Sequence, residues 1–475
     1  MRLALSLSLL IFLAKDMTIV LGIESSCDDT GVAIVKGDGQ ILSNCIDSQL
    51  KQHITNGGII PMLAKEFHVY NIDKVARQAF EQSNLESMKQ VDAIAVTTRP
   101  GLVKSLEVGL NYARILAKKY CRPLIPIHHM QAHALMPLLE RKSIKFPFIT
   151  LLISGGHSLL AIVERYNKFH LLGSSLDEAP GDVLDKVARR CRLKNLGKPF
   201  DSVSGGAAIE ILSQIPGADA YRYFNNDYSV PMHMYKSCDF SFSGYRGKME
   251  TYYPHFDELW TAGNQENLLG ELSHLCSSLQ RAILIQLCKK LQRAIYYYKM
   301  HWRYEHTGAF GVENQSNHLG FDLRGLDDDN VDIVVSGGCA ANNYFIQGLR
   351  RFCLKEIDAD MQVFSPSKHL CNDNGLMIAW NGLLRYKDFK QRLETSTDAE
   401  KLSPSGLTRT FCDKLDNSVL LDESDTDVIE AESSSDIGED LRPSVRTKDF
   451  VLSKFKDPEL KFARSADKNQ IVNKQ

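Results

Sequence analysis

Two histidines with metal-ligand spacing, His129 and His133, stand four residues apart in the chain. On an α-helix, residues i and i+4 share a face, so both imidazoles can reach one metal ion. Met130, Gln131 and Ala132 lie between them, so the glutamate of the H-E-x-x-H peptidase motif is missing. The spacing alone leaves open whether the pair binds a metal or only packs.

Asp373 precedes a predicted helix over residues 376–385. An aspartate at such a place usually caps the helix N-terminus. It can also serve as a third, carboxylate ligand beside the two histidines. Two histidines and one carboxylate leave coordination positions free for a substrate.

Three Ser-Gly-Gly turns, at residues 154–156, 204–206 and 336–338, follow or flank apolar segments. Glycines allow backbone amides to approach an anion or a nucleotide closely. None of the turns matches the P-loop or the Rossmann motif, so those two classes of nucleotide site are disfavoured.

Two groups of acidic residues could also take part in chemistry. Glu24, Asp28 and Asp29 crowd one predicted turn, where they could bind a metal–phosphate group or supply a general base. A solvated turn with local hydrogen bonds explains them equally well. Asp182 and Asp185 lie three apart at a predicted helix start, where capping is the simpler role for the first.

The elements that must position these residues form a repeated pattern. Residues 18–23 and 31–35 read as strands around a polar turn, and residues 148–153 and 158–163 repeat that layout. The two hairpins start about 130 residues apart, which predicts a duplicated α/β core with one hairpin per lobe.

Further periodicity completes the layout. We predict strands at 91–96, 124–127 and 331–335, and helices at 105–119, at 268–298 and from 342. Residues 301–329 read as a surface insertion. We expect a leader over 1–17, lobes over 18–147 and 148–410, and an acidic, then basic, disordered tail over 411–475.

Composition limits the class of protein. The 475 residues carry a net charge of -2, but residues 422–440 hold nine acids and no Lys or Arg. Without them 49 acids face 56 bases, so the body is mildly basic, which permits a nucleic-acid partner. The 11 cysteines form no C-x-x-C pair, which argues against a disulfide framework or a cysteine zinc site. The apolar run over 3–13 is too short to span a bilayer.

Seven motifs together carry a family resemblance. They are residues 22–30 (GIESSCDDT), 128–133 (HHMQAH), 153–157 (ISGGH), 180–186 (PGDVLDK), 239–244 (DFSFSG), 336–342 (SGGCAAN) and 371–375 (CNDNG). In this order they resemble the tRNA threonylcarbamoyladenosine transferase family, once labelled O-sialoglycoprotein endopeptidases. Residues 99–101 (RPG), 179–182 (APGD) and 377–382 (MIAWNG) resemble its mitochondrial branch.

The resemblance implies a duplicated actin-like, Hsp70-like fold. It also implies transfer of a threonylcarbamoyl group from threonylcarbamoyl-AMP to the exocyclic amine of the adenosine 3′ of the anticodon, in tRNAs that read ANN codons. By similarity, His129, His133 and Asp373 bind one divalent metal ion, iron or zinc. The residues that by similarity bind the adenylate are Leu152, Ile153, Ser154, Gly155, Gly156, Asp185, Gly206, Glu210 and Asn342.

The chemistry adds one hypothesis. An aromatic amine is a poor nucleophile, so Asp28 or Asp29 is expected to help accept its proton. The resemblance further implies a tRNA partner, a separate synthase that supplies threonylcarbamoyl-AMP, a homodimer and a mitochondrial matrix location; no membrane helix is expected. Three alternatives stay open at this point: a metallopeptidase, an ATP-dependent sugar kinase on the same fold, and a non-catalytic actin-like module.

Overall fold

The first sheet consists of five strands, most of them rich in aliphatic and β-branched residues. They are β1 (Ile19–Glu24), β2 (Asp29–Lys36), β3 (Ile41–Ser48), β4 (Ala93–Arg99) and β5 (Leu124–His128). Their order is β3-β2-β1-β4-β5, antiparallel along β1–β2–β3 and parallel along β1–β4–β5. The central strand β1 is buried along its whole length, as expected for a strand that is covered on both faces.

The second sheet repeats this pattern. It holds β6 (Phe148–Ile153), β7 (Ser158–Arg165), β8 (Lys168–Ser174), β9 (Asp332–Ser336), β10 (Val363–Phe364) and β11 (Glu439–Asp440). From β8 through β7, β6 and β9 to β10, strand order and directions match those of the first sheet. The predicted duplication is therefore confirmed, and β11 is an added edge strand.

In each half, helices follow the first three strands. The first half contains α2 (Leu50–Thr55), α3 (Pro61–Gln82), the 3-10 turn η1 (Met88–Gln90), α4 (Val103–Tyr120) and α5 (His129–Glu140). The second half contains α6 (Pro180–Arg190), η2 (Leu193–Leu196), α7 (Gly205–Ser213), α8 (Ser243–Met249), α9 (Tyr253–Ala262), α10 (Gln265–Tyr297), η4 (Tyr298–Trp302), η5 (Gly338–Ala341), α12 (Asn343–Phe352), η6 (Cys353–Ile357), α13 (Lys368–Cys371), α14 (Gly375–Thr395) and α16 (Arg442–Thr447).

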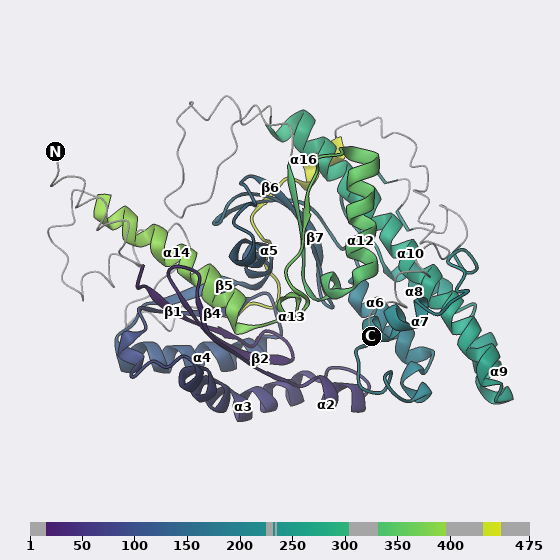
Figure 1. Cartoon of the computed structure of the whole chain (residues 1–475), viewed down its shortest axis with the longest axis horizontal. Coiled ribbons are helices and arrows are strands. Elements are labelled where there is room, and N and C mark those ends of the chain that lie inside the picture. The colour runs from purple at the N-terminus through teal and green to yellow at the C-terminus, as the bar shows by residue number, and fades with distance from the viewer. Residues whose placement is uncertain (1–15, 225–230, 233–234, 304–330, 396–430, 448–475) are drawn as a thin grey trace, which may run out of the picture.

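The elements stack in layers around three apolar cores. Helices α3 and α4 cover the outer face of the first sheet, and α14 lies on its inner face (Figure 1). Helices α5 and α14 pack together between the two sheets in one core. Helices α10 and α12 lie against the outer face of the second sheet. The inner layer, α5 and α14, thus lies at the junction of the two lobes.

Glycines allow α14 to approach the first sheet very closely. A Cβ atom at Gly22 of β1 would lie 2.2 Å from the backbone nitrogen of Ala379 in α14. A Cβ atom at Gly375, the first residue of α14, would lie 2.6 Å from the backbone nitrogen of Ala33 in β2. This contact brings a helix from the second half of the sequence onto the sheet of the first half.

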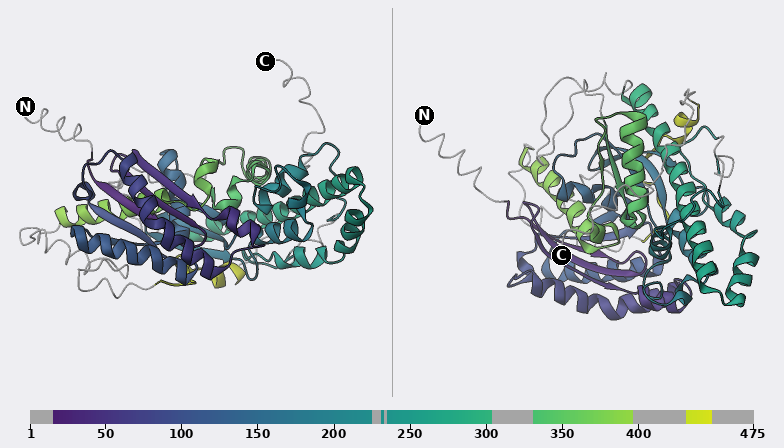
Figure 2. Two further views of the ribbon diagram at one scale, coloured as in Figure 1. Left: turned by 90° about the horizontal axis from the view of Figure 1, so that it is seen from below. Right: turned by 45° about the vertical axis from the view of Figure 1, so that its right-hand side comes forward.

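The computed structural model describes residues 16–224, 231–232, 235–303, 331–395 and 431–447 (Figure 2). The predicted insertion over 301–329 lies almost wholly outside these ranges, as do residues 1–15 of the predicted leader. Each predicted strand and helix named above matches an element of the same type. The bounds agree to within a few residues, except that the helix predicted over 376–385 continues to Thr395 and that the long helix predicted to residue 298 ends in a π-turn from Tyr298. None of the described helices is long and apolar enough to cross a membrane, and no described cysteine forms a disulfide.

The tail differs from its prediction in one part. A disordered segment was expected over 411–475, yet residues 431–447 form β11 and α16, and β11 pairs with β8. Ile437 and Val445 are buried there. Their scattered apolar side chains gave no periodic signal within the acidic sequence, so only the tertiary packing identifies this segment. The rest of the predicted tail lies outside the described residues.

Candidate metal and substrate site

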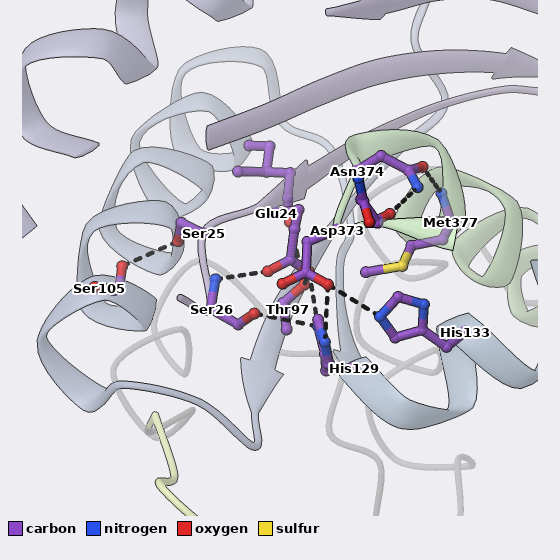
Figure 3. A network of polar contacts seen from close by, with 12 residues as sticks. Glu24, Ser25, Ser26, Thr97, Ser105, His129, His133, Asp373, Asn374 and Met377 are labelled. Atoms are coloured by element: carbon purple, nitrogen blue, oxygen red, sulfur yellow. Dashed lines mark hydrogen bonds and ion pairs between the residues drawn. The ribbon is translucent and has the colours of Figure 1, made fainter. Parts of the chain in front are cut away.

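The two spaced histidines and Asp373 come together between the lobes. His129 is the first residue of α5 and His133 lies one turn later, both buried. The Nε2 atoms of His129 and His133 lie 3.4 Å and 3.0 Å from the Oδ1 atom of Asp373 (Figure 3). Candidate ligand atoms of the three residues all lie within 4.8 Å of one another, so one small cation can contact all three.

Asp373 does not serve as the cap of α14. The side chain of the next residue, Asn374, accepts a hydrogen bond of 2.9 Å from the backbone N–H of Met377. This is the capping contact that the sequence left open for Asp373. Asn374 also donates to the carbonyl oxygen of Asn372 at 2.7 Å, which holds the turn that presents Asp373 to the histidines.

Glu24 orients the first histidine. Its carboxylate is fully buried at the end of β1 and accepts hydrogen bonds from the Ser26 N–H at 2.6 Å and the Thr97 hydroxyl at 2.5 Å. The Nδ1 atom of His129 lies 3.2 Å from the same carboxylate. Because a carboxylate only accepts, Nδ1 carries a proton toward Glu24, which leaves Nε2 as the ring nitrogen that faces Asp373 and that binds a metal ion once its own proton is lost. A carboxylate behind a ligating histidine is the usual support of a metal site.

The electrostatics of this cluster suit a cation. Burial alone would lower the pKa of His129, but the negative charges of Asp373 and Glu24 outweigh it and raise that pKa to about 10. Burial would raise the pKa of Asp373, yet the neighbouring histidines hold it below its usual value. A site that draws a proton this strongly also attracts a metal ion. Two imidazoles and a carboxylate are the donor types that iron and zinc accept.

Asp28 lies on the turn that follows β1, and Asp29 is the first residue of β2. Burial, and then the charge of Asp373, raise the pKa of Asp28. Burial, and then the charge of Asp28, raise the pKa of Asp29 to about 8. Asp28 lines a pocket of about 180 Å³ between the lobes, together with Asp185 and Arg189 of α6. A carboxyl group with a pKa near 8 can hold or release a proton at neutral pH.

The predicted adenylate residues surround the carboxyl ends of β6 and β9. Leu152 and Ile153 are buried in β6, and the turn over 154–156 follows. The turn glycines, Gly155 and Gly156, are exposed, and a Cβ atom at either would meet nothing within 4 Å. The Ser154 carbonyl accepts from the N–H of Gly181 in α6 at 3.2 Å. The N-terminus of α6 therefore closes onto this turn.

The remaining predicted residues connect neighbouring helices. Asp185 of α6 accepts a hydrogen bond of 3.0 Å from the N–H of Gly206 at the start of α7. Glu210 of α7 accepts one of 2.8 Å from the N–H of Asn343 in α12. Asn342 caps α12 through the N–H of Tyr344. The predicted adenylate residues thus belong to one wall of the second lobe, built by β6, α6, α7 and the start of α12.

Two residues near the site were not singled out by the sequence. His157 follows the 154–156 turn, and burial together with the charge of His129 lowers its pKa to about 4. The turn therefore lies within electrostatic reach of the triad. His53 of α2 lines the pocket that contains Asp28. His157 ends the 153–157 motif, although its spacing assigned it no role, whereas only the fold brings His53 near the predicted residues.

Comparison with known proteins decides the family. The model of the tRNA N6-adenosine threonylcarbamoyltransferase family matches residues 40–380. The chain belongs to this family. The transferase is 40% identical over 371 residues to the mitochondrial tRNA N6-adenosine threonylcarbamoyltransferase of Xenopus tropicalis. The match covers 78% of this chain and 83% of the Xenopus protein. It is 38% identical to the human mitochondrial protein, in a match that covers 78% of this chain and 81% of the human one. It is 33% identical to the Legionella pneumophila protein, in a match that covers 77% of this chain and 93% of the bacterial one.

Family membership confirms the transferase interpretation. The protein is an enzyme that modifies adenosine in tRNA by threonylcarbamoyl transfer. This replaces the three alternatives, the metallopeptidase, the sugar kinase and the non-catalytic module. The absence of a peptidase-type glutamate on α5 agrees with this outcome, because residues 130–132 offer no general base.

Proposed function

We propose that the transferase moves the threonylcarbamoyl group of threonylcarbamoyl-AMP to the exocyclic amine of the adenosine 3′ of the anticodon. The substrates are mitochondrial tRNAs that read ANN codons, and AMP is the second product. The observation that supports this reaction best is the buried triad of His129, His133 and Asp373 beside the Ser154 turn. It places a cation site next to the wall expected to hold the adenylate.

The triad holds one divalent metal ion per subunit, iron or zinc. When bound, such an ion acts as a Lewis acid and a template for the oxygen atoms of the substrate. Glu24 keeps Nε2 of His129 directed at the site, and Asn374 keeps Asp373 in place. These residues set the geometry before the substrate arrives, so little reorganisation is needed during transfer.

The second lobe binds and orients the adenylate. Leu152, Ile153, Ser154, Gly155, Gly156, Asp185, Gly206, Glu210 and Asn342 form this part of the site. The open glycines of the turn allow its backbone amides to contact the phosphate. Asp28 or Asp29 accepts the proton that the amine loses, because both lie at the turn between the lobes and favour a proton more than an exposed aspartate does. Single-turnover transfer that stays intact after alanine replacement of each aspartate would refute this role.

A basic edge beside the inter-lobe pocket suits the tRNA backbone. Six Lys and Arg residues and no acid lie between 186 and 198. Arg189 donates to the carbonyl of Gly57 across the pocket. Lys194 and Lys198 are exposed, and no described acidic side chain pairs with them. Exposed lysines of this kind bind the phosphates of a nucleic acid, whatever its base sequence.

The mitochondrial names of the transferase's relatives support a mitochondrial location, and we propose the matrix as the compartment. A separate synthase supplies threonylcarbamoyl-AMP. The active form is a homodimer, since α3 exposes the large apolar residues Met62, Val69 and Tyr70 on the outer layer of the molecule. Exposed apolar side chains grouped on one element are typical of protein–protein contacts.

The test is a reconstituted reaction. Purified protein is mixed with threonylcarbamoyl-AMP and an unmodified ANN-decoding mitochondrial tRNA, and the modified nucleoside is quantified. We expect product from the wild type and a loss of at least 100-fold in the His129→Ala, His133→Ala double variant. Product from both proteins at equal rates would leave the reaction in place and reject the metal role. No product from the folded, metal-loaded wild type would reject the proposed reaction.

A further inference from the structure

Residues 431–447, here called the clasp, lie outside the 40–380 range that defines the family. The clasp crosses from the first lobe to the edge of the second sheet, and in Figure 1 its yellow trace passes α5 on the way to α16. We propose that the clasp is a positioning element for the metal ligands: it holds α5 and α14, through Gln131, in the arrangement that the triad requires. This inference rests on the metal role proposed above.

The start of the clasp is fastened to the first lobe beside the triad. The Glu432 N–H donates to the carbonyl oxygen of Thr98, at the end of β4, at 2.9 Å. The Glu432 carboxylate pairs with Arg99 at 3.4 Å. The carbonyl oxygen of Ser435 lies 3.3 Å from Nε2 of His128, the residue before the first metal histidine. The clasp therefore touches both segments that flank this side of the site.

Gln131 joins the clasp to both helices of the inner layer. Its Nε2 donates to the carbonyl oxygen of Ile437 at 2.8 Å. Its Oε1 accepts a hydrogen bond of 2.6 Å from Arg385 of α14. The Ile437 carbonyl can only accept and the Arg385 guanidinium can only donate, so a single orientation of the Gln131 amide makes both hydrogen bonds. Gln131 stands between His129 and His133 on α5, and α14 follows Asp373 closely in sequence. The helix that carries both histidines and the helix that follows Asp373 are therefore linked through the Gln131 amide, which also binds the clasp.

The end of the clasp is anchored on the second lobe. Ile437 is 2% exposed and packs in the core between the sheets. A Cβ atom at Gly438 would lie 2.2 Å from the carbonyl oxygen of Phe169, so the backbone fits tightly against β8. Glu439 contacts Nδ1 of His170 at 2.8 Å, and Arg446 pairs with Asp239 at 2.7 Å. With both ends fixed, the Ile437 carbonyl is held in position for Gln131.

No described clasp residue contacts His129, His133 or Asp373 directly. The clasp thus acts indirectly. Residues that contact metal ligands without touching the metal often fix the orientation of those ligands in this way. A looser clasp should leave the donor atoms present but less well arranged. The consequence is weaker metal binding and a lower turnover number, without any loss of contact with tRNA.

The experiment compares two variants with a matched control in the full chain. Gln131→Met removes the link while keeping the length and helix propensity of the side chain. Gly438→Ala forces the clasp backbone away from β8. Ser434→Ala, at an exposed position in the same segment, is the control. Co²⁺ binding to the metal-stripped protein, the thermal midpoint, and kcat and KM for tRNA are measured for each.

We expect both variants to bind Co²⁺ at least tenfold more weakly and to lose at least tenfold in kcat, with KM for tRNA within twofold of the wild type. The control should match the wild type. Lower thermal midpoints with unchanged Co²⁺ affinity would overturn the inference and leave the clasp a purely structural element. If Gly438→Ala does not fold, Gln131→Met alone decides. A wild type that binds no Co²⁺ would overturn the metal site and this inference together, whereas unchanged variants of a metal-binding wild type overturn only the inference.

Discussion

At the scale of single residues, Glu24 supports the triad without belonging to it. Its buried carboxylate accepts from Thr97 and Ser26 and fixes the ring of His129. A sequence pattern cannot assign this role, because Glu24 lies 105 residues before its partner. The sequence pointed only to a crowd of acids at the turn over residues 24–30, within which it could not separate a supporting carboxylate from a proton acceptor.

Replacing Glu24 with glutamine tests the supporting role. The amide keeps the shape but loses the charge and can present an N–H to His129, so the imidazole loses its fixed tautomer. We expect a 10- to 100-fold loss in metal affinity, measured by titration of metal-stripped protein. Glu66→Gln, at an exposed position of α3, should leave the affinity unchanged. Equal affinity of both variants would contradict the role of Glu24.

The raised pKa of Asp29 predicts that the stability of the metal-free protein depends on pH. Burial, and then the charge of Asp28, raise its pKa from 3.8 to about 8, so the native state keeps a proton that the unfolded chain releases. Stability therefore falls as pH rises between about 4 and 8. We expect Asp29→Asn to gain stability relative to the wild type at pH 8.5 compared with pH 5, measured by urea unfolding. Exposed Asp360→Asn should show no such trend.

At the scale of elements, the site depends on the approach of α14 to β1. Asp373 reaches the histidines only because Gly22 and Gly375 remove the side chains that would separate this helix from the sheet. The two residues are more than 350 positions apart in the chain. Their pairing is a property of the fold and leaves no local pattern.

Substitution of Gly22 tests this contact. We expect Gly22→Ala to destabilise the fold by about 3 kcal/mol, because its Cβ meets the backbone of α14, which cannot move aside locally. Metal binding should weaken as well, since Asp373 moves with α14. Gly270→Ala in α10, where a Cβ meets nothing within 4 Å, should instead stabilise by about 0.5–1 kcal/mol. Denaturant unfolding of the two variants gives the comparison, and an unaffected Gly22→Ala variant would contradict the close packing.

The elements also show where sequence reasoning succeeded and where it stopped. The two hairpins and the helix predicted over 105–119 were predictable, because apolar patterns with the period of a strand or a helix report local burial. The short edge strands β10 and β11 were not, since two residues carry no period. The acidic composition of residues 422–440 predicted disorder, but Gly438 fits against Phe169, more than 260 residues away, and Ile437 is buried in the core between the sheets.

At the scale of the whole molecule, each lobe provides a different part of the proposed site. In the proposed function, the first lobe provides His129, His133 and the candidate proton acceptors, and the second lobe provides the wall proposed to bind the adenylate. The basic edge at residues 186–198 borders the pocket between them. A long anionic tRNA can contact this edge while its adenosine enters the site.

The basic edge predicts a specific salt effect. Each phosphate contact contributes about 0.7–0.9 to the slope of log affinity against log salt concentration. Lys194→Ala combined with Lys198→Ala should reduce that slope by about 1.5 while kcat stays near the wild-type value. Lys118→Ala combined with Lys119→Ala, on the outer helix α4, removes the same charge and should leave the slope unchanged. Equal slopes for the two double variants would place tRNA elsewhere on the surface.

The most direct test of the central claim, that the triad of His129, His133 and Asp373 holds the one metal ion on which transfer depends, is a metal titration of activity. Metal-stripped wild type receives increasing zinc or ferrous iron, and the rate of tRNA modification is followed against equivalents added. We predict a rise that stops at one equivalent per chain for at least one of the two metals, and no rise for a folded His129→Ala, His133→Ala variant. Full activity of the stripped wild type, or restoration of the double variant by the same metal, would contradict the claim.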